Sequence, residues 1–231
     1  MSQIIGLAGF SGSGKTSSLR TLDPESTFII SCTPKQLAIP GFRKHYSKFQ
    51  IVDGKPTGNW YFTNKFDKIN TMSKVVSTKM PHVKVLVIDD VNYLLSEEMF
   101  SKALEKGYEK FSVLAKNYYD FVLATMTLRD DLTVVFISHL INAGTDIEPE
   151  YRLFTSGKML SNQVNIDGLF NYILYAEKLE STDGETLEFK FRTKPGPHDT
   201  CRSTAGCFED KYIEPDMKYV IDTINAFENN D

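Results

Sequence analysis

Gly9-Phe10-Ser11-Gly12-Ser13-Gly14-Lys15-Thr16 is the stretch that decides the fold. It matches G-x-x-x-x-G-K-T, the Walker A pattern of a phosphate-binding loop. The apolar run 3–8 before it predicts a buried strand, and residues 15–22 after it predict a helix that ends at Asp23-Pro24. A strand, a glycine-rich loop and a helix start are the context that this motif needs, and a chance Gly/Ser linker lacks that context.

The residue types of this loop suit an anionic ligand. Glycines permit tight turns and close approach of the backbone, and successive N–H groups at a helix start point at phosphate oxygens. Lys15 is expected to reach the β- and γ-phosphates, and the Thr16 hydroxyl is expected to hold Mg²⁺. The predicted nucleotide-binding residues here are Gly9, Ser11, Gly12, Ser13, Gly14, Lys15, Thr16 and Ser17.

Two carboxylates follow a second buried strand, predicted over residues 83–88. Ligands of open α/β sheets lie at the carboxyl ends of the strands. We therefore expect Asp89 to share the Mg²⁺ ion with Thr16. Asp90 is a candidate for the base that activates water, although an Asp pair can also simply begin the next helix as its N-cap.

A third buried strand is predicted over residues 133–138, and Ser138 and His139 stand at its end. These two side chains are candidates for sensing the γ-phosphate or orienting water. A histidine held by structural hydrogen bonds is an equally good interpretation. The candidate catalytic residues are therefore Lys15, Asp90, Ser138 and His139.

Cations in the second half of the chain offer a further candidate contact. Arg192 and Lys194 alternate along a predicted strand and therefore share one face of it. A cation there that reaches the γ-phosphate of a neighbouring subunit would stabilise the charge of the transition state. A solvated basic strand is the simpler interpretation. Asn64-Lys65-Phe66-Asp67 matches the N-K-x-D motif with which GTPases recognise guanine. It precedes the 83–88 strand, whereas in GTPases the motif comes well after the corresponding strand, so we interpret it as a chance match.

The order of the predicted elements indicates an α/β protein with a mainly parallel central sheet flanked by helices. Two late strands joined around Asp183-Gly184 predict a C-terminal β-hairpin extension. No repeat or linker interrupts the chain, so a single domain, 1–231, is expected. The other expected elements are strands at 27–31 and 60–63, helices at 65–79, 92–130 with a break near Gly107, and 214–227, an irregular stretch at 33–58, and hairpin strands at 170–179 and 186–193.

Composition narrows the class of protein. The chain has 231 residues, 41% of them hydrophobic. Its net charge of −4 argues against general electrostatic attraction to nucleic acid or membranes, but it is compatible with a local basic patch. Its three cysteines form no C-x-x-C pair and are too few for a disulfide framework. No apolar run approaches the length of a membrane span or of a secretory signal, so a cytoplasmic protein without membrane partners is expected.

The motifs GFSGSGKT, VLVIDD and VVFISHL, in this order, resemble the RecA-like P-loop ATPases. The chain is most similar to small phage ATPases with a stripped RecA core, the AAA-type phage nucleotide-binding proteins. The segments TSGKML, DGLFNYILYAE, FKFRTKPG and TCRSTAGCFED add to this likeness. Some of these proteins belong to the single-strand-annealing-type recombinase group.

The resemblance implies a RecA-like fold that binds ATP and Mg²⁺ and acts as a homo-oligomer on single-stranded DNA, in the host cytoplasm if phage-encoded. A single-stranded DNA-binding protein is an implied partner. Arg192-Thr193-Lys194 matches the spacing of two RecA lysines that contact ATP across the subunit interface. The RecA glutamate that follows the strand equivalent to 27–31 has no counterpart, because Cys32-Thr33-Pro34-Lys35 stands there.

Three functions are therefore compatible with the sequence. The first is a Mg-dependent ATPase that acts on single-stranded DNA in phage-type recombination, repair or replication, with 142–163 as its DNA-facing loop. The second is a small-molecule or nucleotide kinase, which also uses such a loop but needs a cationic lid that the sequence lacks. The third is a non-hydrolysing switch, favoured by the missing glutamate.

Overall fold

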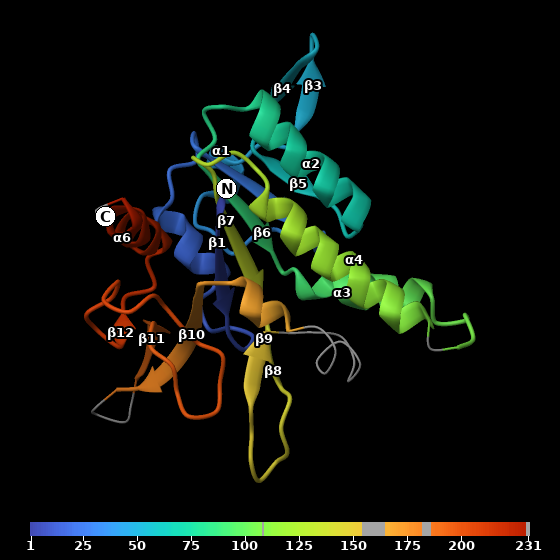
Figure 1. The fold of residues 1–231 in the computed structure, drawn as a ribbon. Coiled ribbons are helices and arrows are strands. Elements are labelled where there is room, and N and C mark those ends of the chain that lie inside the picture. The colour runs from blue at the N-terminus through green and yellow to red at the C-terminus, as the bar shows by residue number, and fades with distance from the viewer. Residues whose placement is uncertain (108, 154–164, 182–185, 230–231) are drawn as a thin grey trace.

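Residues 1–107, 109–153, 165–181 and 186–229 are described in a computed structural model of the chain. They build one eight-stranded sheet with helices on both faces and two small hairpins (Figure 1). The predicted α/β class, with a mostly parallel central sheet flanked by helices, is confirmed.

The central sheet has the order β12-β11-β10-β1-β7-β6-β2-β5. Its strands from β10 to β5 are parallel, and β11 and β12 continue the sheet in antiparallel pairing. The bounds are Gln3–Ala8 (β1), Thr27–Ser31 (β2), Trp60–Phe62 (β5), Val85–Asp89 (β6), Thr133–Ser138 (β7), Tyr172–Glu180 (β10), Leu187–Arg192 (β11) and Tyr212–Ile213 (β12). The strand β7 thus lies between β1 and β6. Because the three strands are parallel, their carboxyl ends lie at the same edge of the sheet.

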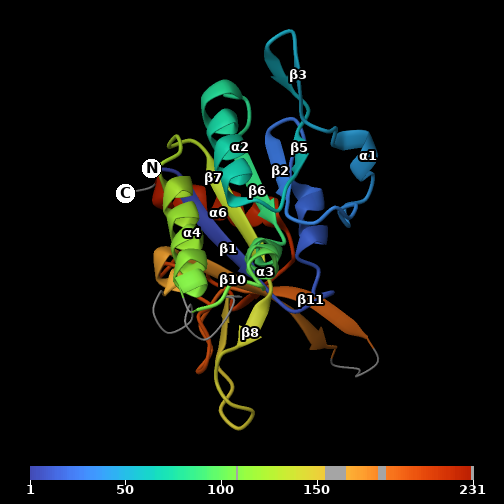
Figure 2. The same ribbon diagram turned by 90° about the vertical axis from the view of Figure 1, so that its right-hand side faces the viewer.

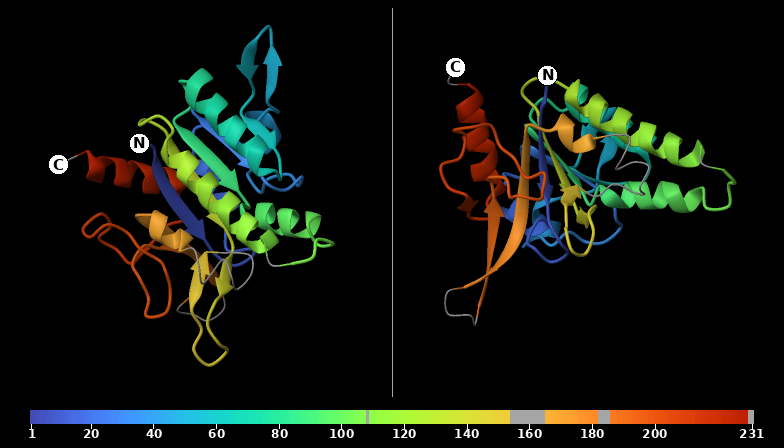
Figure 3. Two further views of the ribbon diagram at one scale, coloured as in Figure 1. Left: turned by 45° about the vertical axis from the view of Figure 1, so that its right-hand side comes forward. Right: turned by 60° about the horizontal axis from the view of Figure 1, so that its bottom comes forward.

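Two helical layers cover the sheet (Figures 2 and 3). One face carries α2 (Phe66–Lys79), α3 (Asn92–Ser101) and α4 (Glu109–Met126), and the other carries η1 (Thr16–Thr21), α1 (Phe42–His45) and α6 (Met217–Glu228). Successive side chains of a strand pack on opposite faces of the sheet. In β1, Ile4 belongs to the hydrophobic cluster on one face and Ile5 to the cluster on the other. Burial on both faces explains why these strands read as continuous apolar runs.

Two hairpins leave the body at opposite ends (Figure 1). One pairs β3 (Gln50–Val52) with β4 (Lys55–Thr57), and the other pairs β8 (Leu140–Asn142) with β9 (Tyr151–Leu153). A short 3₁₀ helix, η2, spans Ile166–Leu169. Because β8 begins two residues after β7 ends, the second hairpin projects from the edge of the sheet where β7 ends.

The structure corrects three expectations. The segment after the glycine-rich loop is a 3₁₀ helix, because the Ser18 and Thr21 hydroxyls bond carbonyls three residues back and favour the tighter turn. The stretch 33–58, expected to be irregular, holds α1 and the β3–β4 hairpin. The first strand of the predicted C-terminal extension, β10, pairs in parallel with β1 and is part of the buried core.

The remaining element predictions are confirmed with small shifts of their ends. The helical region after β6 is interrupted between the end of α3 at Ser101 and the start of α4 at Glu109, and Gly107, with a φ of 96°, lies in this break. The Asp183-Gly184 turn and the Thr155-Ser156-Gly157-Lys158 segment lie outside the described residues.

Candidate functional site

The glycine-rich loop joins β1 to η1 and depends on glycine at three positions. Gly12 and Gly14 adopt φ values of 72° and 87°, in the left-handed region that side chains disfavour. A Cβ atom at Gly9 would lie 2.5 Å from the carbonyl oxygen of Ala176 in β10. The loop is therefore built as a tight turn packed against the neighbouring strand.

Lys15 folds back into this loop. Its side chain is buried, and its Nζ donates to the carbonyl oxygens of Gly9 and Phe10 at 2.7 and 2.9 Å. Burial lowers the pKa of Lys15 to about 8, in spite of the nearby Asp90 and Asp89 charges, which raise it. In the part of the chain that the structure describes, the two neutral carbonyls are the only hydrogen-bond partners of Lys15 Nζ. A buried ammonium with such partners is suited to receive an anion.

Thr16 links the loop to the end of β6. Its hydroxyl lies 3.2 and 3.3 Å from the two carboxylate oxygens of Asp89, which is wholly buried. Burial, followed by the charge of Asp90, raises the pKa of Asp89 to about 7. The sequence-based pairing of Thr16 with Asp89 is thus present as a direct contact between residues 73 positions apart.

Asp90 lies next to this pair in an unusual backbone conformation. Its φ is 60°, and its buried carboxylate accepts from Lys35 Nζ at 2.5 Å and from the Thr33 hydroxyl at 3.4 Å. Burial acts to raise the pKa of Asp90, but His139 and Lys35 outweigh it and hold the pKa at about 2. An acid held in its ionised form is a weak proton acceptor near neutral pH.

His139 approaches Asp90 from the end of β7. Its Nε2 lies 3.7 Å from Oδ1 of Asp90, and the ring of Tyr93 meets its ring edge-on. Ser138 is buried beside it and donates to the His139 carbonyl oxygen at 3.2 Å. A carboxylate beside an imidazole resembles the pairing of base and orienting group used in nucleophile activation, here at ion-pair distance.

The site residues predicted at the carboxyl ends of β1, β6 and β7 therefore lie together at that edge of the sheet. Sequence reasoning missed Thr33 and Lys35, which follow β2, the next strand in the sheet. The signal was their place after a buried strand end, where the other site residues also stand.

Arg192 and Lys194 have partners within their own chain. Arg192 is buried, and its guanidinium pairs with Glu177 at 2.6 Å and Asp199 at 2.7 Å over the ring of Tyr175. Lys194 lies beyond the end of β11 and donates to the Glu209 carbonyl. The predicted contact with a neighbouring subunit's nucleotide would require these contacts to be exchanged, and it stays a prediction.

We expect Arg192→Met to destabilise the protein by about 3 kcal/mol, because it leaves the buried Asp199 carboxylate without its cation. Urea unfolding measures the change, with Lys190→Met as control because the ion-pair partners of Lys190 are exposed. Equal stability of the two variants would contradict a structural role for the Arg192 network.

A cavity of about 570 Å³ borders the loop on the side of these residues. Phe10 and Ser13 of the loop contribute to its wall, and the Ser13 hydroxyl, itself buried, has no hydrogen-bond partner among the described residues. The cavity places open space directly against the glycine-rich turn.

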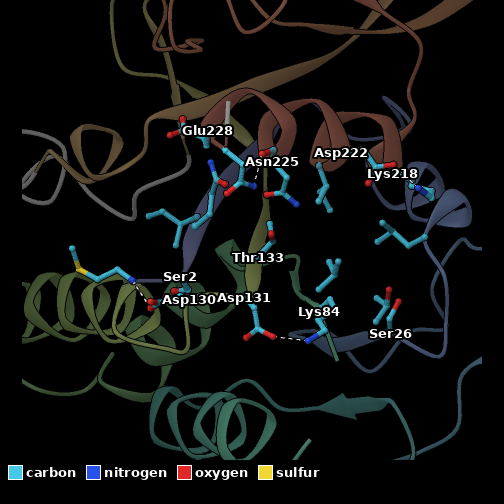
Figure 4. A pocket seen from close by; sticks show the side chains of 18 of the residues that line it. Ser2, Ser26, Lys84, Asp130, Asp131, Thr133, Lys218, Asp222, Asn225 and Glu228 are labelled. Carbon is cyan, nitrogen blue, oxygen red and sulfur yellow. Dashed lines mark hydrogen bonds and ion pairs between the residues drawn. The ribbon is translucent and has the colours of Figure 1, made fainter. Parts of the chain in front are cut away.

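A larger cavity, of about 910 Å³, lies at the opposite edge of the sheet, between α6 and the amino ends of the strands (Figure 4). Its charged groups largely neutralise each other, as Lys84 does with Asp131 at 2.5 Å and Lys218 with Asp222. This self-pairing and the distance from the strand carboxyl ends separate it from the site around Lys15.

No protein-family model matches the chain, and no curated protein matches its sequence. Within the described ranges, no helix is both long and apolar enough to cross a membrane. Among the same residues, no group of three or more His, Cys, Asp or Glu side chains is arranged to hold a metal ion. Thr16 and Asp89 still suit Mg²⁺, which takes one or two protein oxygens and completes its shell with phosphate and water oxygens.

Proposed function

We propose that the protein is a Mg-dependent P-loop ATPase with a RecA-like core. The observation that carries the proposal is the contact of the Thr16 hydroxyl with the buried Asp89 carboxylate, beside the Lys15 ammonium. These are the oxygen ligands and the cation that a metal-bound triphosphate needs. Their convergence at the carboxyl ends of parallel strands supports a ligand site there.

Each residue then has a defined task. Lys15 exchanges its carbonyl partners for phosphate oxygens, and the backbone N–H groups of the loop bind the remaining oxygens. Thr16 and Asp89 hold Mg²⁺, which neutralises charge on the phosphates when bound. His139, oriented by Asp90, accepts the proton of the attacking water, a task for which the geometry favours it over Asp90.

The resemblance supports single-stranded DNA as the polymer on which a homo-oligomer acts, in phage-type recombination, repair or replication. A single-stranded DNA-binding protein as partner and a cytoplasmic location belong to the same proposal. The described part of the 142–163 loop disfavours phosphate contact, because it carries Asp146, Glu148 and Glu150. Residues 154–163 of that loop lie outside the described residues.

A switch that binds ATP without turnover is the second candidate. The observation that favours it is the ion pair between Lys35 and Asp90, which keeps that carboxylate a weak base. A kinase remains the third candidate and is decided by the same experiment.

Phosphate release from ATP, measured with and without single-stranded DNA and with Mg²⁺ or EDTA, tests the proposal. We expect Mg-dependent release that DNA increases. Binding without release supports the switch, and transfer of phosphate to a nucleoside without stimulation by DNA supports the kinase. Absence of any ATP binding contradicts all three.

A further inference from the structure

Lys35 has an exposed side chain whose ammonium pairs with a buried carboxylate. Its side chain is 57% exposed, whereas the side chain of Asp90, 2.5 Å away, is 3% exposed. The Thr33 hydroxyl contacts the same Asp90 oxygen at 3.4 Å, and His139 contacts the other. The ammonium of Lys35 can therefore leave while the carboxylate keeps two neighbours.

Lys35 also lies close to the phosphate loop. It pairs with Asp90, and the preceding residue, Asp89, accepts from the Thr16 hydroxyl of the loop. The positive charge of Lys35 acts to lower the pKa of both Lys15 and Asp89. A terminal phosphate held by Lys15 and by the Mg²⁺ ion that Thr16 and Asp89 would bind brings new negative charge close to Lys35. A terminal phosphoryl group offers three oxygens and more charge than one carboxylate, so it competes for a flexible ammonium.

We propose that Lys35 is the residue that distinguishes a nucleoside triphosphate from a diphosphate in this site. With a triphosphate bound, the Lys35 ammonium moves from Asp90 to the terminal phosphate, and Asp90 keeps His139 and the Thr33 hydroxyl as its neighbours. With a diphosphate bound, Lys35 stays on Asp90. This inference rests on the proposed function, because it assumes that phosphates occupy the 9–16 loop.

A purely structural ion pair makes a different prediction. If Lys35 only neutralised Asp90 and supported its left-handed backbone, its removal would lower stability and weaken both nucleotides equally. Discrimination between the two nucleotides therefore separates the roles.

Calorimetric titration with Mg·ADP and with Mg·AMPPNP, a non-hydrolysable ATP analogue, tests the proposal on wild type, Lys35→Gln and Lys35→Arg. We expect Lys35→Gln to weaken AMPPNP about tenfold, the usual loss for one charge-assisted hydrogen bond, and to leave ADP affinity nearly unchanged. Lys35→Arg should retain most of the preference for AMPPNP. Lys74→Gln, which changes an exposed lysine of α2, is the matched control and should alter neither affinity.

Thermal unfolding without nucleotide establishes that each variant is folded. Equal loss of both nucleotides, or an unchanged ratio of the two affinities in Lys35→Gln, would overturn the assignment while leaving the ATPase proposal intact. A wild-type protein that binds neither nucleotide would instead contradict the proposed function, and this inference with it.

Discussion

Replacement of Lys15 by alanine is expected to abolish tight ATP binding, with an affinity loss on the order of 100-fold. The reason is the position of this ammonium, which is buried in the loop and whose hydrogen bonds within the described residues go only to the Gly9 and Phe10 carbonyls. Removing it takes away the only buried cation of the loop, so that the loop itself then offers the phosphates neutral groups alone. The fold should survive, because no carboxylate is left unpaired by the change.

Calorimetric titration with Mg·ATP measures this loss, and Lys44→Ala, at an exposed lysine of α1, is the matched control. The control should bind as the wild type does. Unchanged affinity in Lys15→Ala would show that the 9–16 loop is not the nucleotide site.

Asp89→Asn is expected to have opposite effects on activity and stability. Mg-dependent ATP hydrolysis should fall on the order of 100-fold or more, because metal stabilisation of phosphoryl oxygens is worth several kcal/mol. The metal-free protein should become more stable by roughly 1 kcal/mol, since the buried charge disappears and asparagine still accepts from Thr16.

The pH dependence of stability gives a second measurement for the same variant. The pKa of Asp89 is about 7 in the folded protein, against 3.8 for an ordinary aspartate. The folded state thus keeps a proton that the unfolded chain releases, so stability falls as pH rises from about 4 to about 7. Asp89→Asn should lack this fall.

Unfolding in EDTA-containing buffers across this pH range measures the slope, with Asp210→Asn, at an exposed position, as control. A slope that persists in Asp89→Asn would assign the titration to another group. Undiminished Mg-dependent hydrolysis in this variant would remove Asp89 from the metal site.

Local sequence patterns were sufficient to predict most strands of the central sheet. Runs such as 83–88 and 133–138 are apolar throughout because their strands are covered on both faces, and this signal is contained in the sequence itself. The ends of these runs located Asp89, Asp90, Ser138 and His139. The place of β10 could not be read in the same way, since an apolar strand followed by a turn and a second strand also fits a separate hairpin.

The sequence by itself determined the 9–16 loop, its lysine and threonine, and the carboxylates at the end of β6, because each is defined by neighbours a few residues away. Only the tertiary structure decided which distant side chains share their charge. Lys35 and Asp90 are brought together because β2 and β6 are neighbours in the sheet, and Arg192 is enclosed by Glu177 and Asp199. Such contacts depend on strand order and on side-chain directions in loops, which follow no period in the sequence.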